Sequence, residues 1–160
     1  MASRTRASFW VFILILVVLH FVVHVAMGMG TRAPDFMTIA VLLASRRMSG
    51  SAAAALGLVL GILVDALSLT TFGALALTYT ILAFLGARSR DLFEGDSLLF
   101  VAVFIFLGTW LREALFVALT RSTIGEPWGV LLTGAPLVAL YTAISAMIAL
   151  TLYRAATGER

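Results

Sequence analysis

Apolar residues fall into six long blocks along the chain, separated by short polar segments. The blocks cover residues 9–29, 34–44, 51–68, 70–87, 98–119 and 130–153. As a helix, the first block is long enough to cross the roughly 30 Å of hydrocarbon in a bilayer. We therefore predict an all-α integral membrane protein, a bundle of six transmembrane helices that forms a single domain over residues 1–160.

The second block is too short to cross a membrane unaided. As a helix, residues 34–44 would be about 17 Å long, with Pro34 suited to the first turn. The sequence leaves three alternatives open for this segment. It is tilted past its ends, it is re-entrant, or neighbouring helices shield it from lipid.

The third block carries small residues at a regular spacing. Ala53, Gly57, Gly61 and Asp65 lie four residues apart, so a helix presents them on one face. The Gly57-x-x-x-Gly61 spacing allows a second membrane helix to approach closely. We predict that Ala53, Gly57 and Gly61 form a helix-packing face, either inside the bundle or against a partner protein.

Composition supports the membrane assignment. Hydrophobic residues make up 62% of the chain and charged residues 12%, with a mean hydropathy of +1.09, whereas about a quarter of a typical soluble domain is charged. The absence of cysteine excludes disulfides, thiolate metal sites and thiol nucleophiles. The formal charge of +3 comes from arginines placed singly or in pairs at block ends. This placement indicates a topology signal and not a nucleic-acid surface.

The arginines also predict an orientation. With the N-terminus inside, six spans put Arg32 and Arg121 outside and Arg112 within a span. The remaining arginines then lie inside: Arg4, Arg6, Arg46, Arg47, Arg88, Arg90, Arg154 and Arg160. Because positive residues favour the cytoplasmic side of a membrane, we predict that both termini are cytoplasmic.

In this topology, ionisable residues within the spans gather in the outer half of the bundle. They form what we call the outer polar cluster: His20, His24, Asp35, Asp65, Arg112 and Glu113. An unpaired charge in lipid costs about 3 kcal/mol, so Arg112 is expected to pair with Asp65 or Asp35. Our specific hypothesis is an Asp65–Arg112 pair. Asp35 alternatively serves only as a favourable acid in the first turn of a helix.

The outer polar cluster does not match a known catalytic or metal motif. His20 and His24 have the spacing of a shared metal site but lack the acid of an HExxH motif, so hydrogen bonds across helices are the expected role. The chain also has no Ser-His-acid arrangement with recognisable flanks, no P-loop and no dinucleotide fingerprint. We therefore predict no enzymatic activity, no metal and no cofactor.

A series of short motifs runs through residues 34–90. In chain order these are Pro34-Asp35, Arg46-Arg47, Gly57, Gly61, Asp65, Ser68, Gly73, Ala76-Leu77 and Gly86-Ala87-Arg88. In this order and spacing, the series resembles the rod shape-determining protein MreD family. One departure is Thr71-Phe72-Gly73, where the family usually has Pro-Leu-Gly. The first block and the last two resemble the family in length, hydropathy and charge placement.

The resemblance implies a non-enzymatic scaffold of the bacterial elongation complex, in the cytoplasmic (inner) membrane, that helps to position or regulate peptidoglycan synthases. The partners it implies are an MreC-like single-span protein, a RodA-type glycosyltransferase with its class B penicillin-binding protein, and the lipid bilayer, with no nucleic acid. It also implies a fold similar to the substrate-binding subunits of energy-coupling-factor transporters. The alternative function is therefore vitamin capture by such a subunit, with the outer polar cluster as the ligand site.

Overall fold

The computed structural model is a bundle of α-helices. It describes residues 2–26, 33–67, 72–90, 97–120 and 129–158, and none of these residues forms a strand. The helices are α1 (Ala2–Phe21), α2 (Phe36–Ser45), α3 (Gly50–Asp65), α4 (Ala74–Ser89), α5 (Leu98–Leu119) and α7 (Ala135–Thr157). Two π-helical turns, η1 (Val22–Ala26) and η3 (Val130–Gly134), follow α1 and precede α7. The prediction of an all-α protein is confirmed.

The helices differ in whether they could cross a membrane alone. Within the described residues, three helical segments are long and apolar enough: Arg6–His24, Leu98–Leu119 and Leu131–Thr157. The helices α2, α3 and α4 are apolar but shorter, at 10–17 residues. Six membrane crossings therefore stay a prediction.

Helix ends follow local capping chemistry. α5 occupies residues 98–119, as predicted, and the Ser97 hydroxyl accepts a hydrogen bond from the Phe100 N–H at 3.1 Å. The predicted start of the fourth helix at residue 70 is wrong, because Gly73 has φ 95° and helix α4 begins after it. Helix α3 ends at Asp65, whereas the predicted third block ends at residue 68. Residue 68 lies outside the described residues, and so does residue 29, the predicted end of the first helix.

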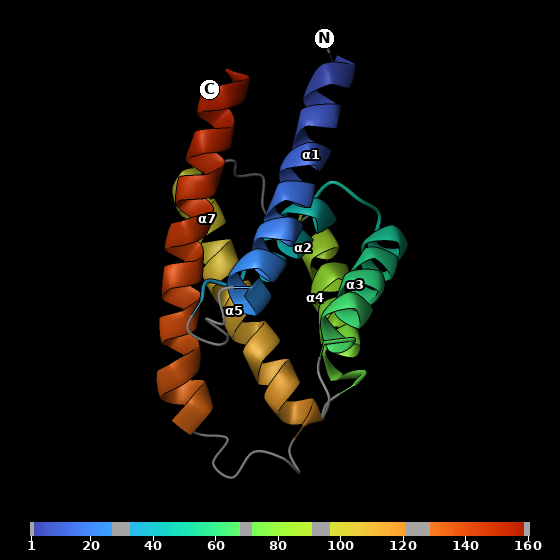
Figure 1. Ribbon diagram of the computed structural model, residues 1–160, viewed down its shortest axis with the longest axis vertical. Helices are drawn as coiled ribbons and strands as arrows, with labels where there is room; N and C mark the ends of the chain where they lie inside the picture. Colours follow the sequence, from blue (N-terminus) through green and yellow to red (C-terminus); the bar gives the residue numbers. More distant parts are fainter. Residues whose placement is uncertain (1, 27–32, 68–71, 91–96, 121–128, 159–160) are drawn as a thin grey trace.

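The short helix α2 forms the core of the bundle. Every residue from Met37 to Ser45 is buried, and α2 contacts α1, α3, α4, α5 and α7. Figure 1 shows it in the middle of the bundle, behind α1. At about 15 Å, α2 is shorter than a bilayer. Of the three alternatives for this segment, the structure shows shielding by neighbouring helices.

Glycines allow two helices to approach α2 closely. A Cβ added at Gly86 of α4 would overlap the Ser45 side chain, and one added at Gly108 of α5 would overlap the Leu42 side chain. Both α2 residues are buried. Close packing around α2 therefore depends on the absence of a side chain at these two positions.

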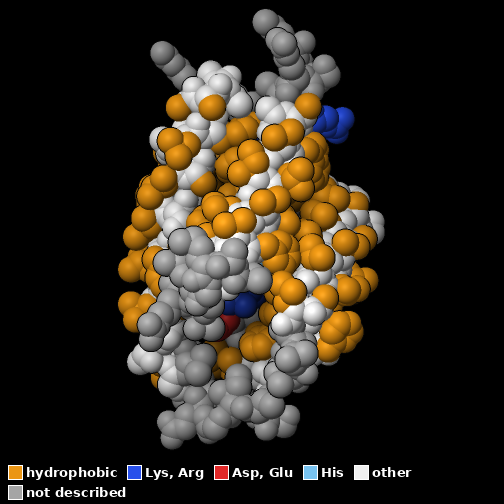
Figure 2. Space-filling view, in the orientation of Figure 1, with side chains coloured by type: hydrophobic (Ala, Val, Ile, Leu, Met, Phe, Trp, Pro, Cys, Tyr) orange, Lys and Arg blue, Asp and Glu red, His pale blue; other side chains and the backbone are white. Residues whose placement is uncertain are grey.

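The surface of the bundle is apolar. Large exposed hydrophobic side chains occur on all five helices around α2, and Figure 2 shows hydrophobic atoms over most of the visible face. Charged atoms are visible in a recess in its lower half. The start of α1 and the end of α7 lie at the same end of the bundle (Figure 1), opposite this recess.

Candidate functional site

Asp35 anchors a buried polar network at the beginning of α2. It is the N-cap residue, and its side chain accepts hydrogen bonds from the Thr38 N–H at 3.0 Å and the Thr38 hydroxyl at 2.6 Å. Its own backbone N–H donates to the Thr142 hydroxyl of α7 at 3.1 Å. The Tyr79 hydroxyl of α4 lies 3.4 Å from both carboxylate oxygens. The carboxylate is thus bonded within α2 and contacted from α4.

Arg112 of α5 supplies the positive charge of this network. Its Nε lies 3.0 Å from Asp35 Oδ2, and a terminal guanidinium nitrogen lies 2.6 Å from Glu113 Oε2. The Arg112 and Asp35 side chains are 14% and 6% exposed. A guanidinium and a carboxylate buried to this degree need each other, because either alone would lose its hydration without compensation. Of the two predicted partners for Arg112, the structure selects Asp35.

Asp65 has a different role from the one predicted. It is fully buried at the end of α3 and accepts hydrogen bonds from the backbone N–H groups of Gly73 at 2.9 Å, Leu75 at 3.3 Å and Ala76 at 2.8 Å. These groups belong to the first turn of α4, where N–H groups lack partners within the helix. Asp65 therefore caps α4, and the hypothesis of an Asp65–Arg112 pair is wrong.

His20 lies in the last turn of α1, and His24 lies in η1, which follows it. Their rings stack with centroids 4.1 Å apart. His20 Nδ1 accepts a hydrogen bond from the Met37 N–H at 3.3 Å, so in the neutral ring the proton is on Nε2. The 3.6 Å from His20 Nδ1 to Asp35 Oδ1 is too long for a hydrogen bond. Within the part of the chain that the structure describes, no three His, Asp or Glu side chains are placed to hold a metal.

A single cavity of about 320 Å³ collects most of the outer polar cluster. Five of the six members line it, and Asp65 does not: the lining residues include His20, His24, Asp35, Arg112 and Glu113, with Tyr79. Apolar side chains from α3, α4, α5 and α7 complete the wall: Val64, Leu75, Phe116 and Val138. The cavity therefore combines polar groups from α1, η1, the beginning of α2, α4 and α5 with apolar side chains from α3, α4, α5 and α7.

The predicted packing face lies between α3 and α4. Ala53, Gly57, Gly61 and Asp65 are the buried residues of α3. A Cβ at Gly57 would overlap the Tyr79 carbonyl oxygen, and one at Gly61 would lie 2.5 Å from the Ala76 Cα. Of the two alternatives for this face, the structure therefore shows the one inside the bundle.

Sequence reasoning missed three polar residues of the network: Thr38, Tyr79 and Thr142. Thr38 follows Asp35 by three residues, the spacing at which an N-cap acid meets a backbone N–H, so a signal for it was present. Tyr79 and Thr142 sit in apolar runs on other helices. No local pattern marks them, because their role depends on which face each helix turns toward α2.

Comparison with known proteins supplies the family. The family model of the rod shape-determining protein MreD matches residues 3–153. No curated protein and no solved structure matches the chain. The match extends from the start of α1 into the last turns of α7 and so includes α2 and the residues around Asp35 and Arg112. The chain therefore belongs to the MreD family of rod shape-determining proteins.

Proposed function

We propose that this protein is a non-enzymatic scaffold in the cytoplasmic membrane of a rod-shaped bacterium. It binds an MreC-like single-span protein and helps to position or regulate a RodA-type glycosyltransferase with its class B penicillin-binding protein. The observation that carries this proposal is the family match over residues 3–153, because family membership supports a role in rod-shape determination.

The state of the buried polar groups favours a structural role over chemistry. Asp65 accepts three backbone hydrogen bonds at the start of α4, and Asp35 is bonded by Thr38 and paired with Arg112. Carboxylates held in this way orient helices and cap their ends. Asp65, moreover, does not line the cavity.

Recognition of a partner would use the outer helix faces. Because Gly57 and Gly61 pack against α4, the opposite face of α3 is available to lipid or to another membrane helix. It carries four exposed apolar side chains: Leu58, Val59, Ile62 and Leu63. Helix association in lipid depends on close packing of such surfaces.

Vitamin capture by a subunit of an energy-coupling-factor transporter is the alternative function. The likeness of fold on which it rests stays a prediction, since no solved structure matches the chain. In that function, the ligand would occupy the cavity beside Arg112. The two functions require different partners, so they can be distinguished by what the protein binds.

Gentle affinity purification of the full chain from native membranes tests the proposal. We expect a single-span protein with a periplasmic domain to co-purify, together with cell-wall synthases. Recovery of a transmembrane coupling subunit with a pair of ATPases would overturn the scaffold function in favour of vitamin capture. An unrelated tagged membrane protein of similar size, purified in parallel, provides the control for non-specific association.

A further inference from the structure

The helices of this bundle differ in the length of apolar surface that they present to their surroundings. α7 exposes large hydrophobic side chains from Leu132 to Leu152, a stripe of about 30 Å. This length matches the hydrocarbon thickness of a typical bilayer, roughly 30 Å. The hairpin of α3 and α4 is shorter, because each of its helices has 16 residues and is about 24 Å long. Figure 1 shows the hairpin across the bundle from α7, which extends beyond it along the long axis.

One end of the α3–α4 hairpin is fixed by Asp65. The carboxylate of this last residue of α3 accepts hydrogen bonds from the N–H groups of Gly73 at 2.9 Å and Ala76 at 2.8 Å. The end of α3 is therefore held against the first turn of α4, and the chain turns back at this level. The lengths of α3 and α4 thus limit the height of the hairpin.

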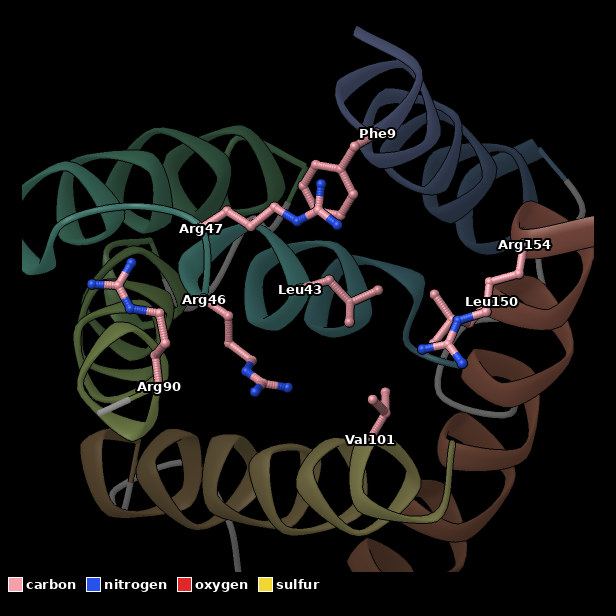
Figure 3. Close-up of a pocket in the computed structure, with 8 residues that line it drawn as sticks. All are labelled: Phe9, Leu43, Arg46, Arg47, Arg90, Val101, Leu150 and Arg154. Atoms are coloured by element: carbon pink, nitrogen blue, oxygen red, sulfur yellow. The ribbon is translucent and has the colours of Figure 1, made fainter. Parts of the chain in front are cut away.

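Polar residues mark the other end of the hairpin. Arg47 lies between α2 and α3, and Arg90 is the C-cap residue of α4. Figure 3 shows both on the side of the bundle formed by α3 and α4, across from Arg154 of α7. Ser49 and Ser51, at the start of α3, are exposed. Because arginines beside membrane spans favour the lipid headgroup region, the hydrocarbon beside the hairpin is expected to end at this level.

The large exposed side chains of the hairpin occupy only part of this height. On α3 and the residue pair that follows it, they run from Leu58 to Leu67, about 14 Å. Nearer the start of α3, the exposed face carries the small residues Ala52 and Ala55. On α4, the large exposed side chains lie between Leu77 and Leu85. The stripe of large apolar side chains on α3 is therefore less than half as long as the one on α7.

We propose that the α3–α4 hairpin is a lipid-facing surface that thins the bilayer beside it and selects phospholipids with short acyl chains. A bilayer thins around a hydrophobic segment that is shorter than itself. Tilting of the bundle cannot correct the shortfall, because the height that a helix spans never exceeds its length. A spanning helix of about 20 residues would extend past the hairpin, whereas lipid adapts to it. This lipid contact goes beyond the scaffold function, because it needs no protein partner.

The depth of fluorescent labels in the bilayer tests the thinning. Because the chain has no cysteine, Ala52→Cys and Leu67→Cys place a label at each end of the exposed α3 face, and Leu132→Cys and Leu152→Cys are the matched controls on α7. The full chain is reconstituted in dioleoyl phosphatidylcholine, and nitroxides at the headgroup or in the acyl chain quench each label according to its depth. We expect all four labels at headgroup level. Labels on α3 that lie about 4 Å deeper than those on α7 would overturn the inference, because the bilayer would then be equally thick on both sides.

Mixed vesicles of short-chain and long-chain phosphatidylcholine test the selection of lipid. Ile62→Cys on α3 and Ile144→Cys on α7 place labels at exposed positions within the two helices. With the nitroxide on the dimyristoleoyl lipid in a dierucoyl background, we expect roughly twofold stronger quenching of the α3 label than of the α7 label. Equal quenching of the two labels would overturn the selection. Absence of quenching at Ile62→Cys by either lipid would show that a second copy covers the hairpin, and would overturn its assignment to lipid.

Discussion

The guanidinium of Arg112 lies 3.0 Å from the carboxylate of Asp35, although the two residues are separated by three helices along the chain. The pair joins the middle of α5 to the beginning of α2, the helix around which the bundle is built. Because both side chains are largely buried, the Asp35 carboxylate depends on Arg112 for compensation of its charge, whereas Arg112 also has Glu113 as a partner.

Removing the positive charge of the pair is expected to destabilise the protein more than removing the negative one. Arg112→Gln should lower the free energy of unfolding by about 3–5 kcal/mol, because the Asp35 carboxylate is left buried without its cationic partner. Asp35→Asn should cost less, because Arg112 keeps the Glu113 carboxylate as a partner. The double variant should lose less than the sum. Unfolding in mixed detergent micelles measures all three. Strictly additive losses would argue against a direct contact.

Asp65 is expected to act independently of Arg112. Asp65→Ala removes the acceptor for three N–H groups at the start of α4 and should cost about 1–2 kcal/mol. Asp65→Asn keeps one carbonyl acceptor and should cost less. Combined with Arg112→Gln, either substitution should give additive losses of unfolding free energy. A coupling between Asp65 and Arg112 larger than about 0.5 kcal/mol would contradict this assignment.

Bulk between α3 and α4 is expected to disrupt the bundle. Gly57→Leu and Gly61→Leu should each separate the two helices, because the side chain would meet α4 backbone atoms that cannot move aside locally. Ala52→Leu is the matched control, since Ala52 lies on the exposed face of α3. Yield of folded protein from membranes and resistance to unfolding by detergent are the measurements. If leucine were tolerated equally well at Gly57, Gly61 and Ala52, the assignment of Gly57 and Gly61 to a helix-packing face would be wrong.

Glycines that face side chains are expected to tolerate substitution better than those that face backbone. A methyl group at Gly108 meets the Leu42 side chain, which can change rotamer, whereas one at Gly57 meets the Tyr79 carbonyl. Gly108→Ala should therefore cost about 1–3 kcal/mol and Gly57→Ala more. The order of the two unfolding free energies is the test, and the reverse order would contradict it.

Single cysteines can test the predicted orientation cleanly, because the chain contains none. Ala7 is exposed near the start of α1, and Ala156 is exposed near the end of α7, at the same end of the bundle. Gly129 is exposed just before η3. With cytoplasmic termini, a membrane-impermeant maleimide should label Gly129→Cys in spheroplasts. It should label Ala7→Cys and Ala156→Cys only after the membrane is opened. The opposite pattern would invert the topology.

Much of this protein could be predicted from local sequence. The span of α5 follows from one apolar run and the Ser97 cap, and the buried face of α3 follows from residues spaced four apart. Both depend only on helical periodicity and on groups a few residues away in the chain. Family membership could likewise be predicted, because its motifs occur in order along residues 34–90.

Only the tertiary structure decided which acid pairs with Arg112. Asp35 and Asp65 were both plausible partners, since each is an acid near the outer end of an apolar block. Asp65 is close in the chain to the start of α4 and is satisfied by its backbone N–H groups, whereas Asp35 meets Arg112, Tyr79 and Thr142 from three other helices. Spacing within a helix is set by its own geometry. Distances between helices depend on the rotation and packing of all of them, which no single stretch of sequence encodes.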